Sequence, residues 1–449
     1  MLRIDNLKLP VGVKEDKLRA ACAHALRVSE EALVSVHLLR RSIDAREGVK
    51  LVCSCAVEVK NESGVLRRCK NKNVQPYAPK KYTPPAPVSA PEVSPVVIGA
   101  GPAGLFCALL LARCGARPIL LERGRAVEQR KRDVEHFWRT GELDLTSNVQ
   151  FGEGGAGAFS DGKLNTGTHD ARIGFVLAEF AAHGAPEHIT YDAKPHIGTD
   201  VLVEVVQNLR REIIERGGEV RFGHRVTGLS TEDGHIAALT VAGPAGSYTL
   251  PARQVILAIG HSARDTFEML HAQGVPMEPK PFSMGVRIEH RQADINAAQY
   301  GAAAERLPAA DYSLSCHLPD GSSAYTFCMC PGGFIVPAMT DAAQSVVNGM
   351  SPSLRNSPYA NSGLVTEVRL ADFEHLRAEW GELAGLKFQQ RFEESARQRG
   401  GEHQIAPAQR VADFVAGRAS GSLPRTSYIP GITPSRLDEW MPGFIAQGL

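Results

Sequence analysis

The first 60 residues alternate between two hydrophobic periods. A two-residue period, typical of strands that bury one face, runs through LRIDNLKL, ALVSVHLL and VKLVCSCAVEV. The spacing of an amphipathic helix runs through KEDKLRAACAHAL. The pattern predicts a small α+β domain over residues 1–75. Cys53 and Cys55 fall on one face of the last strand, and we interpret them as packing residues because a metal site would need more ligands nearby.

A second hydrophobic pattern begins after a proline-rich stretch at residues 76–94, which predicts an extended linker. It gives a strand and turn in VVIGAGPAG, then an apolar helix, then a strand in PILLERG. Farther on, TDVLVEVVQNLRREIIERGG predicts an amphipathic helix that begins at a Thr-Asp cap. Short strand-like segments follow it up to QVILAIG. Strands and helices alternating in this way indicate an α/β domain.

Three glycines in VVIGAGPAGLF have the spacing and context of a dinucleotide-binding turn. Gly99, Gly101 and Gly104 follow the strand and open the helix, as the Gly-x-Gly-x-x-Gly motif requires. The first permits a tight turn, the second lets the backbone approach a pyrophosphate, and the third lets the helix pack on the strand. Glu122 ends the next strand, where a carboxylate hydrogen-bonds the ribose of an adenosine. A carboxylate would repel a 2′-phosphate, so the motif favours FAD or NAD over NADP.

A second segment, FGEGGAGAFSDGKLNTG, repeats the same glycine spacing at Gly152, Gly154 and Gly157. The residues before it are mostly polar and turn formers follow it, so neither the strand nor the helix of a Rossmann unit is expected. Consecutive glycines still free backbone N–H groups for an anion or a ring, and Lys163 adds a cation. We therefore expect one dinucleotide held by two loops.

Charge and cysteine usage limit the partners of the chain. The formal net charge of +1 gives no overall field toward nucleic acid or anionic lipid, so we expect neither as a partner. The N-terminus lacks the apolar core of a signal peptide, and the nine cysteines are scattered over a long chain. These features predict a cytoplasmic protein with reduced thiols, and no metal site is expected.

Several longer segments resemble a known group of proteins. One segment of the chain resembles the FAD-binding start of the glutathione-reductase-like flavoproteins, and it reads VVIGAGPAGLFCALLLARCGARPILLERG. Other segments resemble one group within these flavoproteins, the bacterial FAD-dependent dehydrogenases or oxidoreductases, which are mostly of unassigned substrate. These segments are FGEGGAGAFSDGKLNT, KPHIGTD, ILAIGHSARDT, PFSMGVRIEH, CMCPGGFIVPA and the N-terminal RRSIDAR. The resemblance covers nearly the whole chain and implies FAD as the cofactor.

The resemblance also implies a fold and a set of site residues. The fold is α/β, with a Rossmann-type FAD-binding domain at 95–280 that has a three-layer core and a β-meander, a β-rich substrate domain inserted at 281–410, and the small N-terminal domain. Residues 411–449 would begin the return to the FAD-binding domain. The implied cofactor-binding residues are Gly99, Gly101, Pro102, Ala103, Gly104, Glu122, Arg123, Gly154, Gly155, Ala156, Gly157, Lys163, Asn165, Val226 and Gly260.

The end of the sequence departs from this group. Such flavoproteins usually end with a strand and a Gly-Glu or Gly-Asp loop that opens a helix and holds the ribityl chain. No such motif follows Gly401. We therefore expect a member shortened at its C-terminus, with an incomplete FAD site.

Two residues are the candidates for chemistry at the flavin. Lys163 would act by its charge, and Cys330, with Cys328, lies in FCMCPGGF, where structural thiols on a strand are the alternative. Arg264 is either a phosphate or substrate contact or a helix-capping residue, and His290 and His317 have no recognisable partners.

The expected function is that of an FAD-dependent oxidoreductase that moves a hydride to or from a small organic substrate, with NAD(P)H as the candidate electron donor. The alternative is a non-catalytic flavoprotein whose N-terminal domain docks a partner.

Overall fold

The computed structural model describes residues 1–12, 15–46 and 48–449. Two compact units make up the described chain, and each combines segments that are distant in sequence. Unit 1 comprises Met1–Thr83, Lys163–Ile197 and Gln292–Ala310. Unit 2 comprises Pro84–Gly162, Gly198–Arg291 and Asp311–Leu449. The domain boundaries given above stay predictions.

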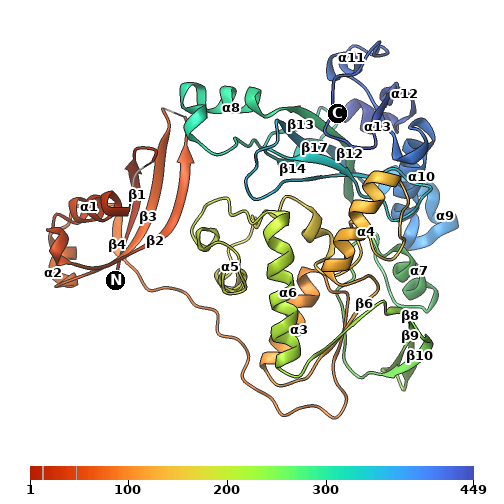
Figure 1. Ribbon diagram of the computed structural model, residues 1–449, viewed down its shortest axis with the longest axis horizontal. Helices are drawn as coiled ribbons and strands as arrows, with labels where there is room; N and C mark the ends of the chain where they lie inside the picture. Colours follow the sequence, from red (N-terminus) through yellow and green to blue (C-terminus); the bar gives the residue numbers. More distant parts are fainter. Residues whose placement is uncertain (13–14, 47) are drawn as a thin grey trace. The chain divides into compact units, whose positions relative to one another are not determined.

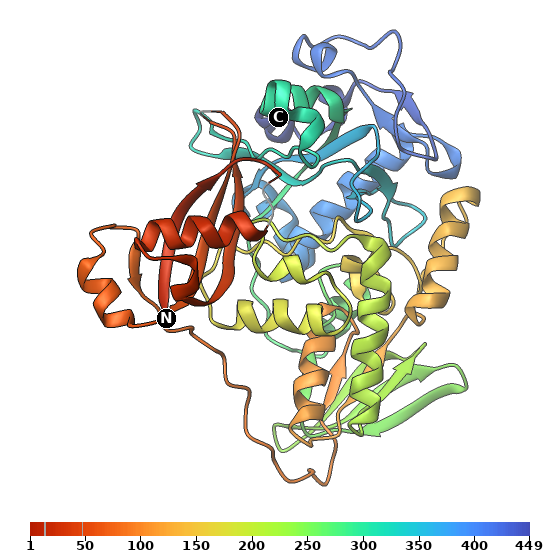
Figure 2. The ribbon, with the colours of Figure 1, turned by 60° about the vertical axis from the view of Figure 1, so that its left-hand side comes forward.

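Unit 1 is built on an antiparallel sheet in the order β2-β3-β1-β4. Its strands are β1 (Leu2–Leu9), β2 (Leu33–Asp44), β3 (Lys50–Val59) and β4 (Val74–Pro76). Helix α1 (Glu15–Leu26) lies across one face of this sheet in Figure 2 and contributes Cys22 and Leu26 to the apolar core. Cys53 and Cys55 are buried in the same core, which agrees with their interpretation as packing residues.

The rest of unit 1 consists of short helices. They are α2 (Glu62–Arg68), α5 (Arg172–Ala182), α8 (Gln292–Tyr300), and the 3₁₀ turns η1 (Glu30–Ala32), η3 (Glu187–Thr190) and η4 (Gly301–Arg306). The segment after η3 pairs with β2, the edge strand of the sheet: Arg41 N–H donates to the Tyr191 carbonyl and Ala193 N–H to the Arg41 carbonyl, both at 2.8 Å. The Arg41 guanidinium adds an ion pair with Asp192 at 2.8 Å. Residues 163–197 are thus fixed to the N-terminal sheet.

Unit 2 contains a parallel sheet in the order β11-β5-β6-β7. Its strands are β5 (Val96–Ile98), β6 (Ile119–Glu122), β7 (Glu219–Phe222) and β11 (Val255–Leu257). Helices α3 (Pro102–Arg113) and α6 (Thr199–Glu215) pack against this sheet and each other (Figure 1). Alternate strand residues Val96, Ile98 and Leu121 instead join the core of an antiparallel meander. The three layers are therefore meander, sheet and helices.

The meander consists of β8 (Arg225–Glu232), β9 (His235–Gly243) and β10 (Gly246–Pro251). Two further helices complete this part, α4 (Val127–Thr140) and α7 (Arg264–Ala272). Helix α6 begins at Thr199, with Gly198 as its N-cap and without a side-chain capping hydrogen bond. The predicted Thr-Asp cap is therefore wrong, because Asp200 accepts from the N–H of Ser353 at 2.8 Å instead.

The C-terminal part of unit 2 is built on a four-stranded antiparallel sheet in the order β12-β17-β14-β13. Its strands are β12 (Phe282–Arg291), β13 (Ser315–His317), β14 (Ser323–Cys330) and β17 (Tyr359–Val368), and β15 (Phe334–Pro337) pairs with β16 (Val347–Met350). One face, with Met284, packs on η5 (Leu370–Leu376) and α10 (Ala384–Arg399). Residues of alternate parity, among them Arg287 and Glu289, project from the opposite face.

Short elements follow α10. They are η7 (Glu402–Gln404), β18 (Ala406–Ala408), α11 (Val411–Val415), β19 (Ile432–Pro434), α12 (Leu437–Trp440) and α13 (Gly443–Gly448), and α9 (Arg377–Trp380) with η6 (Gly381–Leu383) precedes α10. Met441 and Ile445 are buried in the core of the second sheet, and α13 contacts β17. Residues of this segment thus pack on the second sheet. The predicted return of residues 411–449 to the FAD-binding domain stays a prediction. No helix in the described ranges is long and apolar enough to cross a bilayer.

Candidate functional site

The first glycine loop joins β5 to α3, and its glycines have different neighbours. A side chain at Gly99 would collide with the Ala258 carbonyl, and one at Gly104 with the Gly99 carbonyl. A Cβ at Gly101 would meet only the Gly155 Cα, at 3.8 Å. The protein itself therefore requires glycine at 99 and 104, as predicted for the turn and the helix packing. At 101 it leaves space beside the exposed Pro102 and Ala103 at the start of α3, where a pyrophosphate can approach the N-terminus of α3.

The second glycine loop packs directly on the first. Gly154 N–H donates to the Ala100 carbonyl at 2.8 Å, and a Cβ at Gly155 would lie 2.9 Å from the Gly101 Cα. Gly154 and Gly155 have φ of +85° and +57°, a region that favours glycine. The loop then forms a single 3₁₀ turn, η2 (Gly155–Phe159), where no helix was expected. The two motifs form one structure rather than two Rossmann units.

Glu122 joins both loops to the end of β6. Its side chain is buried, and its carboxylate accepts from the N–H groups of Ala100 at 2.8 Å, Gly124 at 2.9 Å and Gly152 at 3.0 Å. The contact that was predicted between Glu122 and a ribose stays a prediction. The observed contacts give the carboxylate a structural role in addition, because the same group fixes one N–H from each loop.

The neighbouring Arg123 is engaged by the protein. Its guanidinium pairs with Asp265 at 2.9 Å and lies over the Phe151 ring at 4.4 Å. Arg123 therefore ties the end of β6 to α7 and to the segment before the second loop. Its predicted role in cofactor binding stays a prediction.

Arg130 supports the second loop from within the protein. Its side chain is fully buried and donates to the carbonyls of Asn148 at 2.9 Å, Val149 at 2.9 Å and Glu153 at 2.7 Å. A side chain at Gly152 would collide with the Arg130 side chain, so Gly152 makes room for it. Burial lowers the pKa of Arg130 to about 10, and the nearby Glu122 and Glu153 oppose this shift. The guanidinium is therefore charged at neutral pH.

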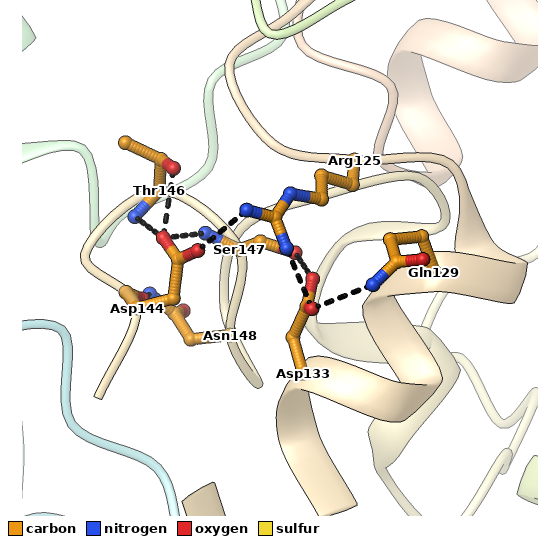
Figure 3. A network of polar contacts seen from close by, with 7 residues as sticks. All are labelled: Arg125, Gln129, Asp133, Asp144, Thr146, Ser147 and Asn148. Carbon is orange, nitrogen blue, oxygen red and sulfur yellow. Dashed lines mark hydrogen bonds and ion pairs between the residues drawn. The ribbon is translucent and has the colours of Figure 1, made fainter. Parts of the chain in front are cut away.

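A polar network fixes the segment that leads into the loop (Figure 3). Arg125 bridges Asp133 on α4, at 2.7 Å, and Asp144, at 3.3 Å. Ser147 donates from its hydroxyl to Asp133 at 2.6 Å and from its backbone to Asp144 at 3.1 Å. Asn148 closes the turn by accepting from the N–H of Phe151 at 3.1 Å. The first glycine loop is held by the strand that precedes it, β5, whereas these side-chain contacts hold the segment before the second loop.

Glu153 is the buried acid of the second loop. It accepts from Val127 N–H at 2.9 Å and pairs with Arg210 of α6 at 2.8 Å. One of its oxygens, Oε1, is buried without a hydrogen-bond partner in the described part of the chain. Burial raises the pKa of Glu153 to about 7, although the Val127 N–H and Arg210 lower it.

The far end of the second loop reaches the C-terminal part of unit 2. Asp161 is buried and forms an ion pair with Arg355 at 2.7 Å. Ala158 and Phe159 share an apolar cluster with Val134 and with Ala338, which follows β15. A single loop thus contacts the dinucleotide turn at one end and the second sheet region at the other.

Cys330 lies in β14 beyond an irregularity in the strand at residues 327–330, where Cys328 has φ of +48°. Its thiol is buried and donates to the Cys328 carbonyl at 3.3 Å. The interaction with Cys328 and burial together raise the pKa of Cys330 well above its ordinary value. Cys330 is therefore a thiol and not a thiolate at neutral pH.

The other predicted residues fall into two groups. Lys163 and Asn165 belong to unit 1, where Lys163 forms an isolated β-bridge with His196. In unit 2, Val226 is buried in the meander core, and Gly260 has open space where a side chain would lie. Their contacts with a cofactor stay predictions, as do those of Ala156 and Gly157 in η2.

Three sequence-based interpretations need correction. Arg264 does not cap α7 but forms a partly buried ion pair with Glu393 of α10 at 2.7 Å, and its alternative role as a phosphate or substrate contact stays a prediction. His290 has a partner, the Tyr312 hydroxyl at 2.6 Å, and His317 lies 3.2 Å from the Ser323 hydroxyl. Tyr312 is 22 positions from His290, whereas Ser323 is six positions from His317 and lies opposite it in the β13–β14 pair.

Sequence reasoning missed Arg130, Glu153, Asp161 and Arg355. One signal was available for Arg130. It lies on the buried stripe of α4 with Val127, Val134 and Phe137, at helical spacing, so that a charged residue occupies an apolar position. Such a position demands internal hydrogen bonds. No comparable pattern marks the other three.

Comparisons with known proteins match the chain in three parts. Residues 92–268 match an FAD binding domain, residues 281–449 match the C-terminal domain of FAD-dependent proteins, and residues 1–60 match a domain of unknown function. An uncharacterized protein of Clostridium beijerinckii is 40% identical over 457 residues, which cover 100% of this chain and 84% of the relative.

Solved structures match at a lower level. The OxyS anhydrotetracycline hydroxylase of Streptomyces rimosus is 18% identical, with 64% of this chain and 48% of that chain covered and a TM-score of 0.29. The glycerol-3-phosphate dehydrogenase of Bacillus halodurans, complexed with FAD, is 11% identical, with 65% and 52% covered and a TM-score of 0.32. The chain thus spans about half the length of these structures, and similarity at this level carries no argument about the reaction.

The cofactor is FAD, as the matches to FAD-dependent domains establish. The geometry fits this cofactor. The space at Gly101 is bordered by a glycine of the second loop and lies beside the first turn of α3, so that a pyrophosphate can approach backbone N–H groups without meeting a side chain. Gly99, Gly101, Gly104 and the second loop are the residues that would hold it.

Proposed function

This chain belongs to the family of FAD-dependent proteins that includes the Clostridium beijerinckii relative, and we propose that it is an oxidoreductase that transfers a hydride through FAD to or from a small organic substrate. NAD(P)H is the electron donor in this proposal. The proposal includes the finer assignment to dehydrogenases of glutathione-reductase-like architecture.

One observation carries the proposal. The second glycine loop contacts Ala100 and Gly101 in the dinucleotide turn through Gly154 and Gly155. A few residues later its Asp161 pairs with Arg355 in the C-terminal part. An enzyme of this kind needs its cofactor beside the domain that binds the substrate. A loop that is fixed at both ends supports that arrangement.

The residues of the chain would bind and orient, while FAD, when bound, supplies the electron transfer. The first loop offers N–H groups to phosphate at the start of α3. Arg130 and Glu122 keep the second loop against the first, so the arrangement of the two loops does not have to form on binding. Cys330 would serve as a neutral thiol, and Lys163 would act through its charge near the flavin.

Gly101→Ala provides a selective test. The φ of Gly101 is −71°, which alanine adopts, and its Cβ would touch only the Gly155 Cα at 3.8 Å. The variant should therefore fold like the wild type but hold less FAD, because the new methyl group occupies the approach to the pyrophosphate. Gly421→Ala, where nothing lies within 4 Å, is the matched control.

The measurements are the absorbance spectrum of each purified protein, mass spectrometry of the released cofactor, and oxidation of NADH or NADPH with an artificial electron acceptor. We expect flavin-dependent oxidation by the wild type and by Gly421→Ala, and a loss of both flavin and oxidation in Gly101→Ala. Bound FAD without oxidation of either nicotinamide would contradict the proposed reaction and favour the alternative of a partner-docking flavoprotein.

A further inference from the structure

The second sheet of unit 2 carries an unusual row of residues on the face opposite its apolar core. In the antiparallel register, Arg287 of β12 lies opposite Gly363 of β17, and Gly363 lies opposite Phe327 of β14. Residues directly opposite in antiparallel strands share a face. The row therefore places a cation and an aromatic ring on either side of a position without a side chain. Adjacent strands are about 4.8 Å apart, so the two outer residues are separated by roughly 10 Å.

Arg287 is held in place by neutral groups. Its guanidinium donates to the side-chain oxygens of Asn361 and, at 3.4 Å, Asn348, and to the Cys328 carbonyl at 3.4 Å. No carboxylate accepts from it within the described part of the chain. A side chain at Gly349 would collide with both the guanidinium and the Asn361 amide, so β16 comes close enough to confine them. Arg287 is thus held in a fixed orientation by neutral partners.

The acidic groups near this row are already engaged. Glu289, two residues along the same face, accepts from the backbone N–H of Ser427 at 3.2 Å and from its hydroxyl. Asp161 is paired with Arg355. Neither neutralises Arg287 by a direct contact, and one positive charge is therefore left for a ligand.

Two further observations indicate what the ligand carries. Asn361 is completely buried, and its amide nitrogen has no hydrogen-bond partner in the described part of the chain. A buried donor without a partner is unfavourable, so an acceptor supplied by a ligand would satisfy it. Phe327 is 62% exposed and lies on the same face as Arg287, so its ring is available to a ligand.

From these contacts we propose that the row Arg287–Gly363–Phe327 is the substrate-binding site of the reaction proposed above, and that it binds a planar monocarboxylic acid with an aromatic or unsaturated body. The carboxylate pairs with Arg287 and accepts from the Asn361 amide. The planar body lies over Gly363 and against the Phe327 ring. One guanidinium with neutral neighbours matches one carboxylate. Gly363 adds no side chain to the row, and the Phe327 carbonyl oxygen lies 2.9 Å from where a Cβ would be.

That the bound acid is the substrate rests on the proposed function, whereas the site itself is tested by a binding measurement. The probe is benzoate, titrated by calorimetry into the FAD-loaded protein. Benzamide, which has the ring without the charge, and acetate, which has the charge without the ring, are the comparison ligands. We expect benzoate to bind more tightly than either.

Two variants locate the site, and each has a control. Arg287→Met should weaken benzoate binding about tenfold or more, because it removes a charge-assisted hydrogen bond. Phe327→Ala should weaken it roughly threefold to tenfold, and its exposed position leaves the fold intact. Arg225→Met in the meander and Val415→Ala, where the side chain is 77% exposed, should leave binding unchanged.

The inference would be overturned if benzoate and benzamide bound equally. It would also be overturned if each of the two single variants, Phe327→Ala and Arg287→Met, bound benzoate as tightly as the wild type. If Arg287→Met fails to fold, the benzoate affinity of Phe327→Ala decides the test. An unchanged affinity in that variant would show that the Phe327 ring does not contact the ligand and would overturn the proposed site. Nicotinamide oxidation is measured on the same preparations. Oxidation without benzoate binding contradicts only this site, whereas benzoate binding without oxidation contradicts only the proposed reaction.

Discussion

Replacement of Arg130 by methionine tests whether a buried charge holds the second glycine loop. Methionine keeps the length of the side chain and its apolar stem but removes all three hydrogen bonds to the carbonyls of Asn148, Val149 and Glu153. These carbonyls are then left without the guanidinium in a region from which water is excluded. The loop should loosen at its base while the first glycine turn, which has its own strand and helix, keeps its shape.

The size of the effect follows from two opposing quantities. Each hydrogen bond from a charged donor contributes about 1.5–3 kcal/mol, so that three contribute about 4–9 kcal/mol. Burial of the charge costs part of this: it lowers the pKa of Arg130 from its ordinary value to about 10, which corresponds to about 3 kcal/mol. We therefore expect the free energy of unfolding to fall by about 1–6 kcal/mol.

Denaturant unfolding of Arg130→Met, followed by circular dichroism, measures the loss, and flavin content reports on the loop. The matched control is Arg132→Met on the same helix, where the side chain is exposed and a change below about 0.5 kcal/mol is expected. A loss in Arg130→Met no larger than in the control would refute the reasoning, since the three carbonyls would then have found other partners at no cost.

Three further variants test the loops and their acids. Glu122→Gln should lower the flavin content of the purified protein, because one charged acceptor of the Ala100, Gly124 and Gly152 N–H groups is lost; unchanged content would contradict the shared role of the carboxylate. Gly155→Val should also lower flavin content with unchanged circular dichroism, because a Cβ there lies 2.9 Å from the Gly101 Cα; full content would place the loop away from the cofactor. Burial raises the pKa of Glu153 above 4.5 to about 7, so its favourable contribution is complete below pH 4.5 and is lost as the pH rises through 7. Glu153→Gln should lack this loss, and parallel pH profiles of the thermal midpoint in wild type and variant would contradict the shift.

The parts of the fold that were predictable depend on neighbours in sequence. The strands β1, β3, β5 and β6 and the turn at Gly99 follow from a period of two, from glycine spacing and from the helix that comes next, all within about 30 residues. The composition of unit 1 was not predictable, because Arg41 pairs with Asp192 across 151 positions. No periodicity carries information about such pairs.

The same limit explains the site. Gly101 and Glu122 were found because the motif that contains them is local. Asp161 and Arg355 are 194 positions apart, and neither lies in a recognisable pattern. The polar network of Arg125 with Asp133 and Asp144 also escaped prediction, because polar segments between strands are ordinarily assigned to solvent.

The two glycine motifs share a spacing for different physical reasons. In the first, Gly99 and Gly104 are required by close backbone packing, and Gly101 is left open. In the second, Gly152 makes room for Arg130, and Gly154 and Gly155 adopt positive φ so that the chain can turn against Gly101. A ligand accounts for only one of these glycines, and packing within the protein accounts for the others. Spacing alone therefore does not separate a nucleotide-binding loop from the loop that encloses it, whereas the atoms that a Cβ would meet do.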